Sequence, residues 1–192
     1  MPATQRSSYH HGDLRAALLT TAMGMLEHGE SFSIRAVARG AGVSPTAPYR
    51  HFPDREALES ALAAQGLRDL KADLTPGREP PSTVEDLADL GVAYVEFALR
   101  RPALFRLMFG NECDDENDER VQAAADVHEL LAAAITGVFP RADPTDLALG
   151  GWGLVHGLAC LYLDRKLAGP STEHVAAQVR ASFIAVLSAQ PN

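Results

Sequence analysis

The sequence SFSIRAVARGAGVSPTAPYRHF, residues 31–52, predicts two short helices joined by a tight turn. Ser33 is a favourable N-cap, because its hydroxyl can accept a hydrogen bond from a backbone N–H group that lacks a partner within the helix. One apolar face follows at helical spacing: Ile34, Val37, Ala38 and Ala41. Gly42 suits a left-handed C-cap, and Ser44 followed by Pro45 suits the start of the second helix. Two helices joined in this way are typical of a helix-turn-helix, whose second helix enters the DNA major groove.

The predicted second helix, residues 45–52, carries little aliphatic bulk, since Tyr49 and Phe52 are its only large apolar side chains. The others are small, cationic or hydrogen-bonding: Thr46, Ala47, Arg50 and His51. Pro48 lacks an N–H group and therefore removes one backbone hydrogen bond, to the carbonyl of Ser44. This composition indicates an exposed surface that contacts bases.

The flanking segments predict two further helices around this pair. An apolar face runs along the preceding helix: Leu14, Leu18, Ala22, Met25 and Leu26. Asp54 is the predicted N-cap of the following helix, and leucines recur on one side of it: Leu58, Leu62, Leu70 and Leu74. We expect a three-helix DNA-binding domain over residues 1–55 and a second helical domain over residues 56–192.

The second domain predicts further amphipathic helices. Ser82 and Glu85 have the spacing of a capping box, and Pro102 begins a short helix. A later apolar face repeats at spacings of three and four: Val121, Ala124, His128, Leu131, Ile135 and Val138. The acidic run at 111–119 lacks the alternating ligands and central glycine of a calcium loop, so it is interpreted as a solvated loop and no metal site is expected.

The helix predicted over residues 144–168 follows the N-cap Asp143 and is apolar nearly all round between residues 147 and 163. Such a helix is expected to be buried on every side, and this segment is marginal for spanning a membrane, which takes about 20 residues. A last helix over residues 172–189 has one apolar face: Val175, Val179, Phe183 and Val186. No strand pattern is apparent, so the predicted fold class is all-α with about nine helices.

Charge is divided unevenly along the 192 residues, whose net charge is −8. Residues 1–55 hold six arginines against four acids, whereas residues 56–192 hold 11 basic and 21 acidic side chains. The slightly basic residues 1–55 (the head) and the acidic residues 56–192 (the body) orient the protein on DNA, because only the head can approach phosphates.

The two cysteines lack metal-type spacing, and the first residues are polar without an apolar leader, so we expect a cytoplasmic protein.

Two stretches in the N-terminal part, YHHGDLRAALL (9–19) and SIRAVARGAGVSPTAPYRHFPDREAL (33–58), resemble the DNA-binding domain of the tetracycline-repressor (TetR) family of transcription regulators. RPALFRLMFG (101–110) and GWGLVHGLA (151–159) resemble the C-terminal domain of one branch of that family, which has a Trp-x-x-x-His-Gly signature. The family usually has an aliphatic residue where this chain has Pro48.

The resemblance implies which side chains contact DNA. Bases are expected to be approached by Arg35, Pro45, Thr46, Ala47 and Arg50. Arg50 is the strongest candidate for a bidentate guanine contact. Phosphates are expected to be held by Ser44, Tyr49, His51 and Arg55, which would set register and not sequence. For Arg55, pairing with Glu59 one helical turn later is the structural alternative.

The resemblance also implies a homodimer on a palindromic operator, and a small-molecule effector that releases the DNA. The two last helices are the expected dimer surface. Candidate linings of the effector pocket are the aromatic side chains, histidines and methionine of the middle helices: Phe97, Phe105, Met108, Phe109, His128, Trp152 and His156. Each of them is at least as well explained as ordinary core. No cofactor is expected, and the effector is not identified by the sequence.

The sequence favours a regulator over two other functional classes. An enzyme is disfavoured because no nucleophile motif, phosphate loop or metal spacing is present. His156 and Asp164 lie eight residues apart on a helix, more than about 10 Å along its axis, which is too far for joint catalysis. A purely structural interaction protein would leave the short-chained, basic face around Arg50 unexplained. Activation in place of repression remains open.

Overall fold

The computed structural model describes residues 11–30, 33–75, 79–110, 118–141 and 143–188. Over these ranges the chain forms eight α-helices and one 3-10 helix, and no strand. The predicted all-α fold is confirmed. The interpretation of residues 111–117 as a solvated loop concerns residues outside the described ranges.

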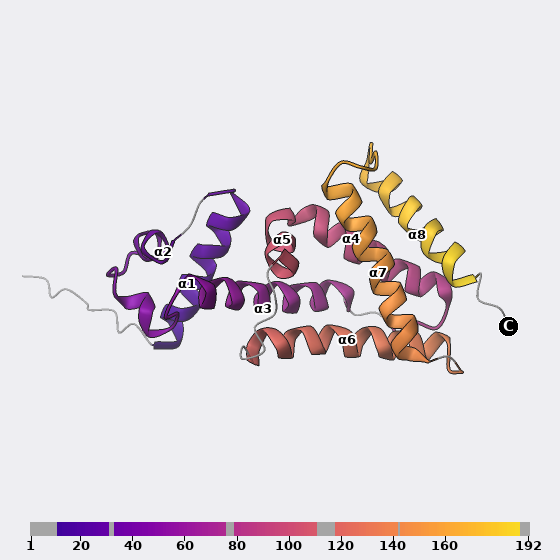
Figure 1. The fold of residues 1–192 in the computed structure, drawn as a ribbon, viewed down its shortest axis with the longest axis horizontal. Helices are drawn as coiled ribbons and strands as arrows, with labels where there is room; N and C mark the ends of the chain where they lie inside the picture. Colours follow the sequence, from indigo (N-terminus) through magenta and orange to yellow (C-terminus); the bar gives the residue numbers. More distant parts are fainter. Residues whose placement is uncertain (1–10, 31–32, 76–78, 111–117, 142, 189–192) are drawn as a thin grey trace, which may run out of the picture. The chain divides into compact units, whose positions relative to one another are not determined.

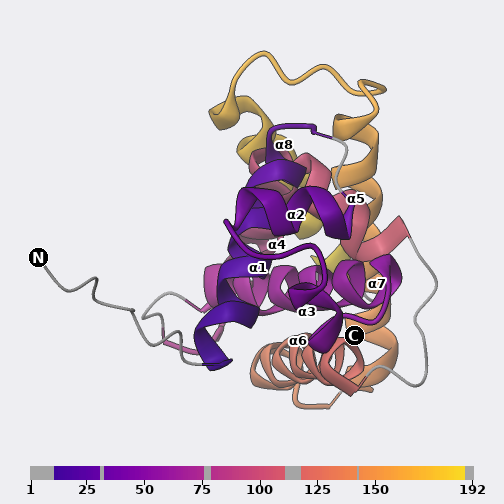
Figure 2. The ribbon, with the colours of Figure 1, turned by 90° about the vertical axis from the view of Figure 1, so that its left-hand side faces the viewer.

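The chain divides into two compact units, Met1–Leu62 and Ala63–Asn192. The first unit contains α1 (His11–Glu27), α2 (Ile34–Gly40), the 3-10 helix η1 (Ala47–Arg50) and the start of α3 (Arg55–Leu74). Within this unit α2 packs against α1 (Figure 2), and α2 also contacts η1. Its core is formed by apolar side chains from all four elements and the turn before α3: Leu18, Ala22, Val37, Ala38, Pro48, Phe52 and Leu58.

The predicted helix boundaries around α2 and α3 are confirmed by their hydrogen bonds. Ser33 accepts from the backbone N–H of Ala36 at 3.2 Å, and Asp54 accepts from the N–H of Ala57 at 2.8 Å. After α2 the chain reverses at Gly42, which has φ +70°. The N–H of the next residue, Val43, reaches back to the carbonyl of Ala38 at 3.0 Å, as in a Schellman motif.

The predicted second helix of the helix-turn-helix is wrong in type and in its starting residue. It is a four-residue 3-10 helix that starts at Ala47, and Ser44 does not cap it. Pro48 supplies the physical reason, because it has no N–H to donate to the carbonyl of Ser44 and its ring excludes an α-helical turn there. The N–H of Ala47 bonds that carbonyl instead, three residues back, at 3.0 Å.

The second unit contains the remainder of α3 with α4 (Val84–Arg100), α5 (Pro102–Gly110), α6 (Asp118–Val138), α7 (Pro144–Leu163) and α8 (Thr172–Ser188). The central helix is α4, which packs against α5, α6, α7 and α8 (Figure 1). Its apolar face is buried as predicted: Leu87, Leu90, Tyr94 and Phe97. The core of this unit therefore forms around one helix.

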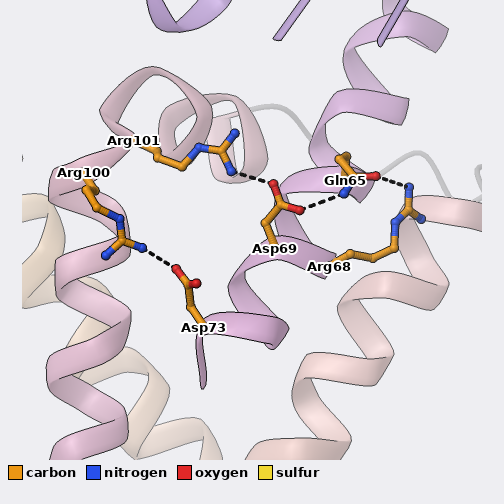
Figure 3. Close-up of polar contacts among 6 residues, drawn as sticks. All are labelled: Gln65, Arg68, Asp69, Asp73, Arg100 and Arg101. Atoms are coloured by element: carbon orange, nitrogen blue, oxygen red, sulfur yellow. Dashed lines mark hydrogen bonds and ion pairs between the residues drawn. The ribbon is translucent and has the colours of Figure 1, made fainter. Parts of the chain in front are cut away.

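Ion pairs fix the second half of α3 to its neighbours (Figure 3). Asp69 accepts from Arg101 at 2.6 Å and from Gln65 at 2.7 Å, and Asp73 pairs with Arg100. These side chains are partly exposed, so each pair contributes about 1 kcal/mol or less. Packing adds to them, because the backbone of α3 approaches α5 closely at Gly66, where an added Cβ would lie 2.6 Å from the sulfur of Met108.

Two predicted features, the capping box of α4 and the first half of the apolar face of α6, are shifted by one residue, whereas Ile135 of α6 is buried as predicted. The capping box joins Thr83 and Asp86, because the Asp86 carboxylate accepts from the N–H groups of Ser82 and Thr83. In α6 the buried residues are Arg120, Ala123, Val127, Ala134 and Ile135, whereas Val121 and His128 are exposed. Burial of Arg120 is unusual for this residue type and is compensated by a hydrogen bond to the Met108 carbonyl at 2.8 Å.

The expectation that the helix over residues 144–168 is buried on every side is wrong for the single chain. Only three residues of α7 are buried, Val155, Ala159 and Tyr162. Leu149 is 62% exposed and Leu161 41% exposed. By length and composition α7 is apolar enough to cross a membrane, a test that a helix covered by protein also passes.

The last two helices also differ from the prediction in detail. Helix α7 ends at Leu163, earlier than the predicted residue 168, and Arg165 follows with a positive φ of 55°. In α8, Val186 is likewise exposed, and Leu187 is buried in its place.

Replacing Gly42 by Ala is expected to lower the free energy of unfolding by about 1–2 kcal/mol, because a side chain is strained at φ +70°. The measurement is equilibrium urea denaturation followed by circular dichroism. Gly24→Ala is the matched control, since an added Cβ at this position in the last turn of α1 meets nothing within 4 Å and Ala is the better helix former. Equal effects of the two substitutions would contradict the assignment of strain to Gly42.

Candidate functional site

The surface around η1 holds the side chains for which the sequence predicted base contacts. Pro45, Thr46 and Arg50 are exposed, Ala47 is half-buried, and Arg35 is exposed on α2. Pro48, between them, is fully buried. The turn is therefore anchored at one residue and presents its neighbours to the solvent, which is the arrangement that a base-reading surface needs.

A shallow groove of about 390 Å³ lies beside this surface. Its lining includes the N-cap residues of α2 and α3, Ser33 and Asp54, together with Arg35, Tyr49 and Arg55. Tyr49 is 46% exposed, which is high for so large an apolar ring. Two arginines line the groove and can attract an anion, and the carboxylate of Asp54, which caps α3, offsets part of their charge.

The predicted phosphate contacts occupy different local environments. Ser44 is exposed and its Oγ lies 3.3 Å from Oγ1 of Thr46, and His51 is half-buried. Arg55 pairs with Glu59 at 2.7 Å, which is the structural alternative considered from the sequence. The pair is on the surface, where such contacts are worth at most about 1 kcal/mol, so a phosphate can compete for the guanidinium.

A second group of side chains in the body forms an aromatic cluster, which we define as Tyr94, Phe105, Phe109, Trp152 and His156. The imidazole of His156 stacks on Phe105, with ring centres 5.3 Å apart, and meets the edge of Phe109 at 4.7 Å. The ring of Trp152 lies 5.8 Å from that of His156. These residues come from α4, α5 and α7, so the cluster holds three helices together.

The polar atoms of the aromatic cluster satisfy one another. Nε1 of Trp152 donates to the Tyr94 hydroxyl at 3.3 Å, and that hydroxyl lies 2.9 Å from Nδ1 of His156. Burial raises the pKa of Tyr94 well above its ordinary value, so Tyr94 keeps its proton and can donate it to Nδ1. Burial also lowers the pKa of His156, so its imidazole is favoured in the neutral form.

Only part of the predicted effector pocket is brought together. Phe105, Phe109, Trp152 and His156 meet in the cluster, and His128 lies at its edge with its ring 5.4 Å from Trp152. His128 is exposed, contrary to the expectation of a buried histidine. Two others have different surroundings: Phe97 lies under the guanidinium of Arg101, and Met108 packs against α3.

Tyr94 belongs to this site, although its sequence position predicted only a core residue of α4. The available signal was its hydroxyl, because a tyrosine on a buried helix face needs a hydrogen-bond partner. Its partners come from α7, more than fifty residues later, so spacing along the chain could not identify them.

Comparison with known protein families gives two matches. Residues 18–62 match the family described as bacterial regulatory proteins, tetR family. Residues 87–188 match the tetracyclin repressor-like C-terminal domain. The two matches cover the unit that carries η1 and the helices that carry the aromatic cluster.

Individual proteins agree with these matches. A protein of unknown function from Rhodococcus sp. RHA1 is 34% identical, with a TM-score of 0.77 over 93% of this chain and 97% of that chain. The TetR family transcriptional regulator PfmR from Thermus thermophilus is 17% identical and shares the fold, with a TM-score of 0.61 over 93% and 97% of the two chains. An uncharacterised HTH-type transcriptional regulator of Haemophilus influenzae is 28% identical over 121 residues, which span 61% of this chain and 59% of that regulator.

The lowered pKa of His156 predicts a pH-dependent stability. The unfolded chain takes up a proton near the ordinary pKa of 6.5, whereas the folded chain takes it up only at lower pH. The stabilisation is therefore complete above pH 6.5 and is lost as the pH falls toward the folded pKa. We expect the free energy of unfolding to decrease between about pH 7 and pH 5.

The matched variant is His156→Asn, which keeps an acceptor for Tyr94 and removes the titrating group. Its unfolding free energy is expected to change less over the same pH range than that of the wild type. Val121→Ala, which removes no titrating group from an exposed position, is the control and should keep the wild-type slope. Urea titrations at several pH values measure all three, and parallel curves for wild type and His156→Asn would refute the role of His156.

Proposed function

Since this chain belongs to the TetR family of transcription regulators, we propose that it is a homodimeric repressor that binds a palindromic operator and leaves it when a small molecule binds. The observation that carries this proposal is the exposure of Pro45, Thr46 and Arg50 around the buried Pro48. Repression is the usual mode of the family, and activation with the same DNA contacts is the alternative. The site of action is the cytoplasm, where the DNA is, and no catalytic activity is proposed.

The proposed DNA contacts follow from exposure and charge in the first unit. Arg35, Pro45, Thr46, Ala47 and Arg50 approach the bases, and Arg50 forms the bidentate contact with guanine that its planar guanidinium favours. Phosphates are held by a second set of side chains: Ser44, Tyr49, His51 and Arg55. The groove lined by Tyr49 and Arg55 supports this second assignment, because Arg55 and Arg35 both line it and a guanidinium forms strong hydrogen bonds with phosphate. Residues 1–55 act as the DNA-binding domain in this proposal.

The proposed dimer surface is the exposed face of α7 and α8. Leu149 and Leu161 lie on α7, and an added Cβ at Gly150, Gly153 or Gly157 would meet nothing within 4 Å in the single chain. Exposed apolar side chains with intervening glycines allow another helix to approach closely, so we assign this face to a second copy, with the four helices forming a bundle. A dimer supplies two reading turns, and two half-sites give the specificity that one small head lacks.

The effector is proposed to act in residues 56–192, among the helices around the aromatic cluster. The cluster joins α4 and α5 to α7, and α7 also carries the proposed dimer surface. Binding there is therefore well placed to change how the two copies meet. To release DNA, the effector must bind the released form more tightly than the DNA-bound form, by about 5 kcal/mol for a nearly complete switch.

Arg50→Ala and Arg55→Ala are expected to affect DNA binding differently. Arg50→Ala should weaken operator binding by about 1–3 kcal/mol and leave binding to scrambled DNA nearly unchanged, because a base contact is lost. Arg55→Ala should weaken both DNAs alike and reduce the dependence of binding on salt, because a phosphate contact is lost. Fluorescence anisotropy with DNA from upstream of the protein's own gene measures this, and equal losses in both variants would contradict the assignments.

Leu149→Glu is expected to raise the dimer dissociation constant by at least about a hundredfold, because a carboxylate would be buried at the interface without a partner. The measurement is analytical ultracentrifugation over a range of concentrations. Val121→Glu is the matched control, since Val121 is also exposed, at 42%, but lies on α6. The dimer surface is misassigned if Leu149→Glu associates as strongly as Val121→Glu.

A further inference from the structure

The turn that carries the proposed base contacts is wound by hydrogen bonds on either side of Pro48. The N–H of Ala47 bonds the carbonyl of Ser44, three residues back, at 3.0 Å. The carbonyl of Pro48 accepts from the N–H groups of His51 and Phe52, both at 2.9 Å. Pro48 is fully buried, so it closes the turn from within the core of the first unit.

The 3-10 winding decides which side chains of the turn share a face. Successive residues of a 3-10 helix are rotated by about 120°, so Ala47 and Arg50 lie one above the other, about 6 Å apart along the axis. In an α-helix the rotation is about 100° per residue, and the same two side chains would differ in direction by about 60°. Base pairs are stacked about 3.4 Å apart, so a face of this length spans about two base-pair steps.

Pro48 excludes the α-helical winding. In an α-helix the residue at this position donates its N–H to the carbonyl of Ser44, whereas a proline has no N–H and its ring collides with that carbonyl. A residue with an N–H group removes both obstacles. Because a buried N–H must be paired and α-helical hydrogen bonds have the better geometry, the turn is then expected to wind as an α-helix.

The two side chains on the shared face recognise different parts of a base edge. Arg50 is exposed, and its guanidinium matches the O6 and N7 acceptors of guanine. Ala47 is half-buried and offers only a methyl group, which can contact the methyl group of thymine in the major groove. Because both side chains are fixed on one face, the two bases that they contact must lie close together.

We propose that Pro48 is a positioning residue for base reading, and that the turn it winds recognises a guanine and a thymine within about two base pairs of each other in each half-site. The inference rests on the proposed function and extends it to the base sequence of the operator. Pro48 stays in the core and contacts no DNA. It acts through the direction of Arg50 relative to Ala47.

Base analogues test the shared face. Selection from a random DNA pool defines the half-site, in which guanine is then replaced by 7-deazaguanine, which lacks N7, or thymine by uracil, which lacks the methyl group. The first replacement should weaken wild-type binding about fivefold or more, and the second about fourfold, the effect of one buried methyl group. Arg50→Ala should be insensitive to 7-deazaguanine, and Ala47→Gly should be insensitive to uracil.

Three results of this experiment would overturn the proposed recognition. The first is a selected half-site without a guanine and a thymine within about two base pairs of each other. The second is a loss of affinity with 7-deazaguanine that persists in Arg50→Ala. The third is a loss of affinity with uracil that persists in Ala47→Gly.

Three substitutions separate the winding of the turn from the volume of the core. Pro48→Val restores the N–H and keeps the number of side-chain carbons, and Pro48→Ala restores the N–H and removes two of them. Val37→Ala is the matched control, since it removes two carbons from a fully buried position of α2 and changes no hydrogen-bond donor. Both Pro48 variants should select a different half-site and lower the preference for the wild-type operator over scrambled DNA about tenfold or more, whereas Val37→Ala should keep both.

The possible outcomes distinguish this inference from the proposed function. All variants are compared at a temperature at which circular dichroism shows them to be folded, and Pro48→Val decides if Pro48→Ala does not fold. Selection of the wild-type half-site by the Pro48 variants, or an equal change in Val37→Ala, overturns the positioning role while the regulator remains. A wild type that binds operator and scrambled DNA alike overturns the proposed function itself.

Discussion

The burial of Pro48 is the constraint on which the proposed DNA-binding surface depends. A proline cannot donate the hydrogen bond that an α-helix needs at this position, so the turn winds as a 3-10 helix. Its ring is held in the core, and the residues on either side of it therefore face outward. In a 3-10 helix, side chains three apart lie on one face, which places Ala47 and Arg50 together. A short, rigid projection thus replaces the longer reading helix that the sequence pattern predicted.

The body is organised around α4, which packs against α5, α6, α7 and α8. Its Tyr94 belongs to the aromatic cluster through its hydroxyl. Trp152 and His156 form the hydrogen bonds of the Tyr94 hydroxyl, so these polar side-chain atoms of the cluster are paired within the cluster.

The sequence predicted those parts of the fold that depend on local chemistry. Ser33, Asp54 and Asp143 cap helices as expected, because a cap requires only a side-chain oxygen and the N–H groups two or three residues later. Features that depend on tertiary packing were missed. The buried face of α6 contains Arg120, whose burial requires the carbonyl of Met108, and no periodicity of apolar residues reveals such a partner. The exposure of α7 also escaped prediction, because an apolar helix gives the same pattern whether its own chain or a second copy covers it.

The exposed glycines and leucines of α7 have a consequence for the stability of the protein. If the second copy covers them, part of the apolar burial that holds the body together is supplied by another molecule. Folding and association are then thermodynamically linked, and the melting temperature rises with protein concentration. The cellular abundance of the chain would in that case set the fraction of it that is folded, as well as the fraction able to occupy two half-sites.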